Sequence, residues 1–480
     1  VRRHSFFFFI ILIVAAVLRL RGLVVQSLWF DELITLCHSR PDLPLGNLIS
    51  ICRDMEAAPP FFYLLLWVWQ HLFGVSEFTV RLLPALLGIG GVAAIYFLGK
   101  ELFSRETGLA AMAITTVTPF HLYYSQEARP YSLIFLATVL SFLFLVRALK
   151  SSRMPDKVLY AGVTLVLLWS HYFGMFVCAA QLIFVMTALL FKNDFARAHQ
   201  RDLKQILGWC LWCVLLFCLL WSAALLRMGA MNSFWTTKPI WYFFVDYFQG
   251  YWGDSLWLSL VLFFLMVFYL VFDNKKHEFV LHKPLLLSWV ITVLAIPYLR
   301  SFNHPSVLVP RYTIVILPAL ILMIAKGLTR IEKTVWRYSI LIGIVALLFL
   351  NIFWAHGNYY TRVTKTQWRE AAAFVMTKDP QGRYPIYVFG GMGDGLMPAF
   401  RARCYGYYFN DIFKRSVKVV PLKRDAVIFQ EGQRQISGFW LLESEFLMEH
   451  RGVFLKKGFR VKHQLFGFNV VATLFVLEQN

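Results

Sequence analysis

Residues 6–32 read FFFFIILIVAAVLRLRGLVVQSLWFDE, an apolar run that leads directly into two adjacent carboxylates, Asp31 and Glu32. The apolar part is long enough to cross a bilayer, for which about 20 residues suffice. Ionisable groups beside hydrocarbon are costly to keep there and usually have a function. The stretch therefore predicts a membrane span that opens into an acidic functional site.

The rest of the chain repeats this apolar pattern. Hydrophobic residues make up 59% of the sequence and charged residues only 15%, with a mean hydropathy of +0.59, which is outside the range of ordinary soluble domains. We therefore expect an all-α polytopic membrane protein of about 11 transmembrane helices, with additional juxtamembrane helices. The predicted spans are residues 6–25, 82–99, 108–123, 131–148, 158–171, 173–191, 206–227, 255–273, 284–299, 311–327 and 336–355.

The distribution of basic residues predicts the orientation. The net charge is +20, which in a soluble protein would suggest a nucleic-acid partner, but in a membrane protein Lys and Arg gather in the cytoplasmic loops. The segment at residues 59–73 is short, begins with two prolines and is rich in tryptophan, so we expect it to lie at the interface rather than to cross. This threading collects the basic clusters on one side, and it predicts a multi-pass protein of the inner (plasma) membrane with a cytoplasmic N-terminus.

An odd number of spans places everything after residue 355 outside the cytoplasm. We expect residues 1–355 to form the transmembrane catalytic domain and residues 356–480 to form a small extracytoplasmic α/β domain. In the latter, residues 368–378 have a helical pattern, and residues 384–389, 439–442 and 469–478 have extended ones. The glycine-rich run at residues 390–395 follows a predicted strand, and we interpret it as a tight turn rather than a phosphate loop.

Polar side chains gather in the loops of the predicted outer face. Asp31, Glu32 and Glu56 follow the first span, and Arg311 and Tyr312 precede a later one. Between them lie residues 124–131, YSQEARPY, and the pair His171 and Tyr172. A carboxylate can deprotonate a hydroxyl nucleophile, and the forked guanidinium group of arginine suits phosphate oxygens. The sequence thus predicts group transfer from a phosphate-bearing donor.

These motifs, in this order, resemble the bacterial relatives of protein O-mannosyltransferases and aminoarabinose (lipid A) transferases, the glycosyltransferase family 39 group with the GT-C fold. The resemblance covers nearly all of the membrane part. It is carried by Leu18 and Arg19 ahead of SLWFDE at residues 27–32, by EAAPPFFY at 56–63, by Phe73, Gly74, Glu77 and Arg81, by residues 124–131, by HYF at 171–173, and by PRY at 310–312.

The resemblance implies an enzyme that takes a sugar from a polyprenyl-phosphate carrier and gives it to an envelope acceptor on the extracytoplasmic face, with inversion and with Asp31 as the general base. Glu32 and Glu56 are then supporting acids. Arg129 and Arg311 are our candidates for binding the donor phosphate. The expected donor and substrate site is formed by Gln126, Glu127, Arg129, Tyr131, His171, Tyr172, Arg311 and Tyr312.

Two features leave alternatives open. Where the better-known relatives have a lysine or histidine beside the Pro-Pro motif, this chain has Ala57 and Ala58, which puts phosphate contact there in doubt. Glu56, Glu127 and His171 could hold a divalent metal ion, although no tight metal-ligand spacing is present. No cofactor is otherwise expected.

Other classes of protein fit parts of the pattern. A transporter or flippase for a lipid-linked sugar would also keep polar residues among its helices, but transporters often contain internal repeats, and none is evident here. A receptor or assembly subunit would not need the acidic and arginine-bearing loops. The acceptor, whether a glycolipid, a polysaccharide or a protein hydroxyl, and the identity of the sugar cannot be read from the sequence.

Overall fold

The computed structural model describes the chain except for residues 1, 57, 192–193, 231–235, 273–281, 355–357, 390–395, 423–436, 444–453, 456–457 and 478–480. The chain forms two compact units. The membrane unit consists of Val1–Leu23, His38–Val75 and Thr79–Tyr360, and the C-terminal unit consists of Val24–Cys37, Ser76–Phe78 and Thr361–Asn480. The segment that carries Asp31 and Glu32 thus belongs to the same unit as the C-terminal region.

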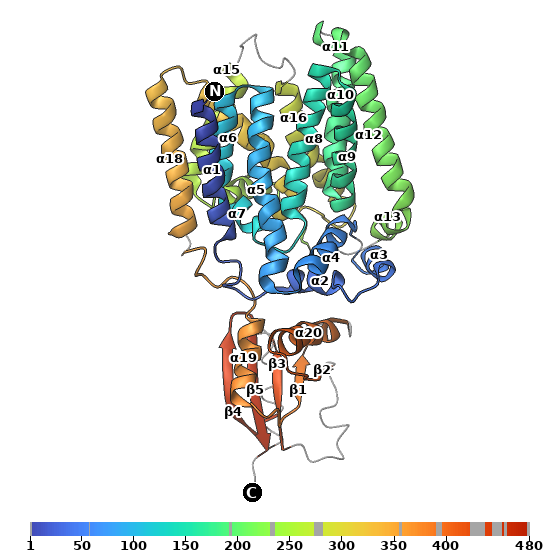
Figure 1. Cartoon of the computed structure of the whole chain (residues 1–480), viewed down its shortest axis with the longest axis vertical. Coiled ribbons are helices and arrows are strands. Elements are labelled where there is room, and N and C mark those ends of the chain that lie inside the picture. Colours follow the sequence, from blue (N-terminus) through green and yellow to red (C-terminus); the bar gives the residue numbers. More distant parts are fainter. Residues whose placement is uncertain are drawn as a thin grey trace. The chain divides into compact units, whose positions relative to one another are not determined.

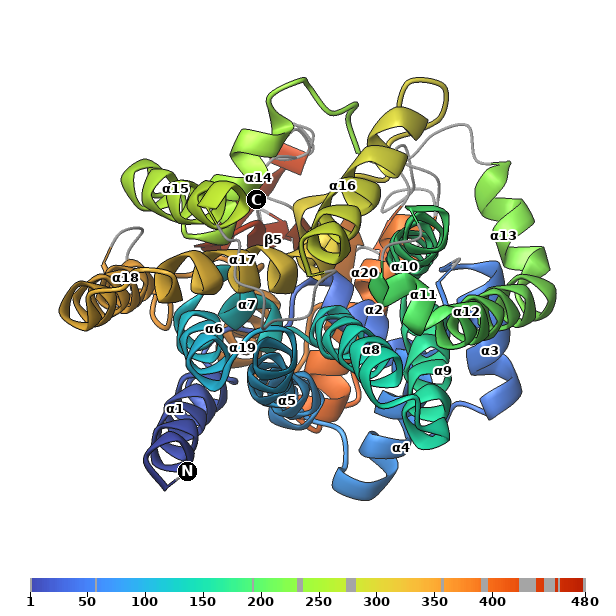
Figure 2. The ribbon, with the colours of Figure 1, turned by 90° about the horizontal axis from the view of Figure 1, so that it is seen from above.

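The membrane unit is helical. Its long helices run side by side in Figure 1 and are seen nearly end-on in Figure 2. They are α1 (Arg2–Leu20), α5 (Glu77–Leu102, whose first two residues belong to the C-terminal unit), α6 (Arg105–Val117), α8 (Tyr131–Ser151), α9 (Met154–Ser170), α10 (Phe173–Phe191), α12 (Gln200–Leu220), α15 (Leu256–Phe272), α16 (His282–Arg300), α17 (Leu317–Thr329) and α18 (Thr334–Phe353). The remaining helices of this unit are α3 (Leu45–Asp54), α4 (Phe61–Phe73), α7 (Pro119–Ser125), α11 (Asp194–Ala198), α13 (Ser222–Gly229), α14 (Phe243–Tyr251) and η1 (Pro310–Ile316).

The chain is a multi-pass membrane protein, but with fewer span candidates than expected. Among the described residues, seven helices are long and apolar enough to cross a membrane, and α14 with α15, which are bent by 98°, would make an eighth. Each of the eleven predicted stretches contains helix within its described residues. However, three of them fall short of that length or hydropathy. Residues 6–25 contain α1, residues 108–123 contain the broken pair α6 and α7, and residues 158–171 contain α9. Pro119 causes the break, because proline removes a backbone donor and disfavours helical backbone before it.

The C-terminal unit contains a five-stranded mixed sheet in the order β2, β1, β3, β5, β4. The strands β1 (Ile386–Phe389), β2 (Val419–Leu422) and β3 (Gly438–Glu443) are parallel, whereas β5 (Val470–Leu477) runs antiparallel to both β3 and β4 (Phe459–Gly467). The unit also contains α2 (Phe30–His38) except for its last residue, α19 (Trp368–Lys378), α20 (Leu396–Gly406) and the π-helical turn η2 (Tyr407–Ile412).

Both faces of the central strands are covered. Phe439 and Phe475 stack within an aromatic core on one face, and Trp440 points the opposite way and contacts Phe374 of α19. The helices α19 and α20 also contact each other, through Trp368 and Tyr405. All four residues of β1 and all six of β3 are buried, which is why these strands are continuous apolar runs rather than alternating ones.

The predicted α/β character of this region is confirmed. The helix predicted at 368–378 is α19, and the strands predicted at 384–389, 439–442 and 469–478 correspond to β1, β3 and β5. β2, β4 and α20 were not predicted. The glycine-rich run at residues 390–395 lies outside the described residues.

One buried carboxyl group makes the stability of the C-terminal unit depend on pH. Glu443 ends β3 and is 4% exposed, and burial raises its pKa to about 7. An unfolded glutamate loses its proton near pH 4.3. The folded unit therefore holds a proton that the unfolded chain has released, so the free energy of unfolding should decrease as the pH rises through this window.

We predict that Glu443→Gln removes this decrease. Hydrogen-exchange protection of β3 and β5 should fall between pH 5 and pH 7.5 in the wild type, after correction for intrinsic exchange rates, and should stay nearly level in the variant. Equal slopes in the two proteins would contradict the assignment.

Candidate active site

The loop between α7 and α8 is a tight turn that presents Glu127 and Arg129. The backbone N–H of Arg129 donates to the carbonyl of Glu127 at 2.7 Å, and the hydroxyl of Ser132 donates to the carbonyl of Tyr124 at 2.9 Å. Glu127 is fully buried, and Arg129 is partly buried. One guanidinium nitrogen of Arg129 donates to the Tyr63 hydroxyl at 3.4 Å, so the loop contacts the residue three positions after the Pro-Pro motif.

A buried arginine fixes the position of this loop. The break at Pro119 leaves carbonyls at the end of α6 without helical donors, and an unsatisfied carbonyl in a membrane interior costs several kcal/mol. The Arg19 guanidinium donates to the carbonyls of Thr115 and Thr116, both at 3.1 Å, and lies 2.8 Å from Nδ1 of His121 on α7. Arg19, which is fully buried, therefore ties α1 to the broken helix.

The amide of Gln126 completes the connection to α1. Its nitrogen donates to the carbonyls of Leu18, Arg19 and Arg21 at 3.3, 2.9 and 2.6 Å, and its oxygen accepts a hydrogen bond from the Tyr359 hydroxyl at 2.9 Å. We expected Gln126 in the substrate site, and the structure gives it a helix-capping role.

Three segments bring charged and aromatic side chains together around Tyr131. Glu127, Arg129 and Arg311 all act electrostatically on the Tyr131 hydroxyl, which is buried at the start of α8. The ring of Tyr312 lies 6.3 Å from that of Tyr131 and 4.8 Å from that of His171. We call this group the arginine cluster. It consists of Glu127, Arg129, Tyr131, His171, Arg311 and Tyr312, six of the predicted site residues.

His171 contributes no positive charge to the arginine cluster. It lies in the connection between α9 and α10, where burial, together with the positive charges of Arg129 and Arg311, lowers its pKa to about 3. The backbone N–H of Phe173 donates to His171 Nδ1 at 3.2 Å, which leaves the proton of the neutral ring on Nε2. The arginine cluster thus holds two guanidinium groups, one carboxyl group and a neutral imidazole, an excess of positive charge suited to an anion.

Other predicted site residues lie in different contacts. Glu56 faces His38, with 3.4 Å between the carboxylate and Nδ1, and the Tyr172 hydroxyl accepts a hydrogen bond from Trp221 at 3.1 Å. Over the described part of the chain, no group of three or more His, Cys, Asp and Glu side chains is placed to hold a metal ion. Glu56, Glu127 and His171 therefore do not form such a group.

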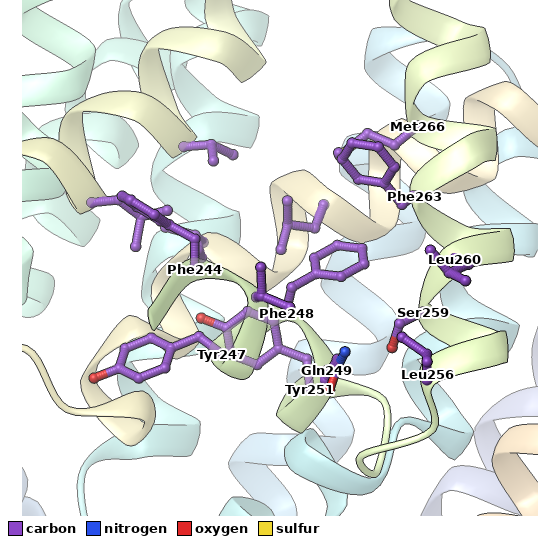
Figure 3. A pocket seen from close by; sticks show the side chains of 15 residues that line it. Phe244, Tyr247, Phe248, Gln249, Tyr251, Leu256, Ser259, Leu260, Phe263 and Met266 are labelled. Atoms are coloured by element: carbon purple, nitrogen blue, oxygen red, sulfur yellow. The ribbon is translucent and has the colours of Figure 1, made fainter. Parts of the chain in front are cut away.

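An apolar groove begins at the helix that carries Arg311. It has a volume of about 390 Å³ and lies between α14, α15, α16, η1 and α17. In Figure 3, the Tyr247, Gln249 and Ser259 side chains lie toward one end, and Phe263 and Met266 lie toward the other. The lining consists of Phe244, Val245, Tyr247, Phe248, Gln249, Tyr251, Leu256, Ser259, Leu260, Phe263, Met266, Val290, Leu294, Ile316 and Leu320.

Ring contacts join the groove to the arginine cluster. The Tyr251 hydroxyl is 2.5 Å from the hydroxyl of Thr313, which lies on η1 two residues after Arg311. The Tyr251 ring also contacts Phe120, which contacts Tyr124, which in turn contacts Tyr131, with centroid separations of 4.8, 4.7 and 5.0 Å. A polar head and an apolar chain of one molecule could therefore occupy neighbouring sites.

Asp31 and Glu32, in the C-terminal unit, differ in their surroundings. Both lie in the first turn of α2, but Glu32 is fully buried whereas Asp31 is partly exposed. One oxygen of Glu32 accepts hydrogen bonds from the backbone of Trp29 at 3.2 Å and from Nζ of Lys365 at 2.9 Å.

Two residues that contact predicted site residues, Tyr63 and Lys365, were not predicted from the sequence. Tyr63 had a local signal, because it follows the Pro-Pro motif, but it was not included among the site residues. Lys365 had none, since it pairs with a carboxylate 333 positions away. The partner of a buried charge at that separation cannot be read from one sequence.

The helical bundle and the mixed C-terminal sheet define a polytopic membrane protein with a small C-terminal sheet domain. Residues 57–222 match the family model described as dolichyl-phosphate-mannose-protein mannosyltransferase. The match covers about a third of the chain, and over these residues it confirms the resemblance predicted from the motifs.

Solved structures support the fold over almost the whole chain. ArnT from Cupriavidus metallidurans matches with a TM-score of 0.61 in the apo state, at 14% identity, and of 0.62 when bound to undecaprenyl phosphate, at 12% identity. Each match covers 97% of both chains. The oligosaccharyltransferase of Archaeoglobus fulgidus, in complex with Zn and sulfate, matches with a TM-score of 0.53 at 12% identity over 86% of this chain and 62% of its own.

One curated relative is similar in sequence over a shorter stretch. Dolichyl-phosphooligosaccharide-protein glycotransferase 1 of Pyrococcus horikoshii is 32% identical over 133 residues, which is 26% of this chain. The match spans only 13% of that relative's length.

Close packing beside the α7–α8 loop gives a direct test of this geometry. A Cβ added to Gly88 on α5 would lie 2.3 Å from the Ser125 hydroxyl oxygen and 2.7 Å from the Ser125 Cβ. We predict that Gly88→Ala lowers the free energy of unfolding by about 1–3 kcal/mol, the usual cost of overpacking. Thermal unfolding in detergent measures the change.

Gly162→Ala on α9 is the matched control, because nothing lies within 4 Å of an added Cβ there. It should leave stability unchanged or raise it by up to about 1 kcal/mol through helix propensity. If Gly88→Ala is as stable as this control, α5 does not pack against Ser125 as described.

Proposed function

We propose that the chain is a membrane glycosyltransferase that transfers a sugar from a polyprenyl-phosphate donor to an envelope acceptor on the extracytoplasmic face. The acceptor is a glycolipid, a polysaccharide or a protein hydroxyl. The observation that carries the proposal is the shared helix η1, where the positively charged arginine cluster meets an apolar groove. The family match and the relative bound to undecaprenyl phosphate support the same donor class.

Arg129 and Arg311 bind the donor phosphate in this proposal. Transfer breaks the bond between the sugar and the carrier phosphate, so negative charge grows on the departing phosphate oxygen. Two guanidinium groups stabilise that charge with charge-assisted hydrogen bonds, which are roughly twice as strong as neutral ones. Neutral His171 can donate from Nε2 without adding further charge.

The groove takes the isoprenoid chain of the carrier. Its lining is almost entirely aliphatic and aromatic, and each buried CH₂ group contributes about 0.8 kcal/mol to binding. In this arrangement the phosphate lies at Arg311 and the isoprenoid chain lies along α15. The contact between Tyr251 and Thr313 then separates the polar part of the site from the apolar part.

Asp31 is the general base, and the acceptor hydroxyl is the nucleophile. The carboxylate takes the hydroxyl proton while the oxygen attacks the anomeric carbon from the side opposite the phosphate, which inverts the configuration as in inverting glycoside hydrolysis. Of the two adjacent acids, Asp31 suits this role better, because Glu32 is fully buried and paired with Lys365. Glu32 then supports Asp31 rather than touching the acceptor.

We predict that Asp31→Asn abolishes sugar transfer and leaves the protein folded and inserted in the membrane. The amide cannot accept the proton, and loss of a general base typically costs about 10²–10⁴ in rate. Purified protein would be incubated with a panel of undecaprenyl-phosphate pentoses and hexoses and candidate acceptors, and release of the carrier phosphate would be measured.

Asp42→Asn is the control, since Asp42 is exposed and bonded to Arg40. It should retain wild-type turnover. Wild-type turnover by Asp31→Asn would end the assignment of the base. Absence of turnover by the wild type with every donor in the panel would count against the enzyme and favour a transporter.

The proposed binding of the isoprenoid chain in the groove is tested by placing a larger side chain in its lining. Ser259→Phe should raise the KM for a 55-carbon donor about tenfold, because displacing about two CH₂ groups at 0.8 kcal/mol each weakens binding by that factor. The KM for a 10-carbon donor should change little. Val261→Phe, on the same helix but at a position that is 47% exposed and outside the lining, is the control. An equal change in KM for both donors would show that the isoprenoid chain does not bind in the groove.

A further inference from the structure

Within the C-terminal unit, residues 361–480 form several hydrogen bonds to the segment at residues 24–29, which leads into Asp31. The Gln26 side-chain oxygen accepts hydrogen bonds from the backbone N–H groups of Thr364 and Lys365, at 2.8 and 3.0 Å. The Ser27 hydroxyl donates to the carbonyl of Thr366 at 2.6 Å. Residues 26–27 are therefore fixed against residues 364–366.

A buried ion pair holds the segment at its far end. Lys365 Nζ lies 2.9 Å from Glu32, and the two side chains are 9% and 0% exposed. An exposed pair contributes little, but removing one partner of a buried pair leaves an uncompensated charge and is strongly unfavourable. The direct neighbour of Asp31 thus cannot move without breaking this pair.

Glu77 holds the middle of the segment. Its Oε1 accepts from the Tyr408 hydroxyl at 2.9 Å and from the backbone N–H of Leu28 at 3.3 Å, while its Oε2 pairs with Arg369. The Tyr408 hydroxyl also accepts from the N–H of Leu28, at 2.8 Å.

Arg369 also forms hydrogen bonds to the first residues of the segment. Its guanidinium donates to the carbonyls of Val24 and Val25 at 2.9 and 3.0 Å. Although burial opposes its charge, Glu77 and Glu370 raise the pKa of Arg369, so the group stays positively charged at any physiological pH.

Resting on the function proposed above, we propose that Lys365, Arg369 and Tyr408 are positioning residues that hold the Asp31 carboxylate in its reactive geometry. Residues 24–29 precede α2 and contain no regular secondary structure that would fix them, so their backbone groups need outside partners. The C-terminal unit supplies these partners. Its role in the reaction is to hold the base, and misplacement of a reacting group by about 1 Å can cost about 10² in rate.

The test replaces the buried lysine in the full-length protein. Lys365→Met should lower kcat about 10–100-fold while the donor KM stays within about twofold, because the donor is bound by other residues. Lys365→Arg, which keeps the charge, should recover most of kcat. Lys378→Met, which removes an exposed lysine from α19, should match the wild type.

A second readout does not depend on turnover. Hydrogen exchange at the backbone amides of residues 26–35 should become faster in Lys365→Met and not in Lys378→Met. Tyr408→Phe keeps the buried ring and removes only the hydroxyl, so it should give a smaller loss of kcat, about 3–10-fold, and faster exchange at Leu28.

Unchanged exchange in this segment, or wild-type kcat in both Lys365→Met and Tyr408→Phe, would overturn the proposal. If Asp31→Asn is inactive while these variants turn over normally, the base assignment stands and only the positioning role is lost. If Asp31→Asn is fully active and exchange still changes, the C-terminal unit holds the segment but the segment does not carry the base.

Discussion

The membrane unit depends on one constraint, which is that backbone carbonyls and charged groups in apolar surroundings must find partners within the protein. The break at Pro119 creates carbonyls that lack helical donors, and the buried Arg19 supplies them. The same arginine contacts His121, and Gln126 caps the helix from which Arg19 projects. The α7–α8 loop is consequently held at its α7 end, next to Glu127 and Arg129.

The two ends of η1 have different surroundings, charged at one end and apolar at the other. On the side of Arg311 and Tyr312 lie two guanidinium groups, one carboxyl group and a neutral histidine. On the side of Ile316, the lining is apolar and extends along α15. A lipid-linked phosphate has the same division, with one anionic group joined to a long apolar chain, so a single short helix can recognise both parts of the donor.

Much of this could be predicted from the sequence, since the hydropathy pattern identifies helices and the polar motifs mark the loops. Six residues expected in the site, among them Arg129 and Arg311, do meet in the arginine cluster. Among the described residues, fewer helices than expected have the length and hydropathy of a full span, in one case because Pro119 breaks a predicted stretch, which apolar composition does not report. The contacts of Gln126 with Leu18 and Arg19 could not be predicted either, because no local pattern links residues 108 and 107 positions apart. The pairing of Lys365 with Glu32 could not be predicted, because no local pattern links residues 333 positions apart.

The most direct test of the account is an experimental structure of the protein with undecaprenyl phosphate bound. We predict phosphate oxygens at about 2.7–2.9 Å from the guanidinium nitrogens of Arg129 and Arg311, the usual distance for such hydrogen bonds, with the isoprenoid chain along α15. A phosphate bound away from both arginines, for example beside Arg330 and Lys333 at the opposite end of α17, would contradict the account.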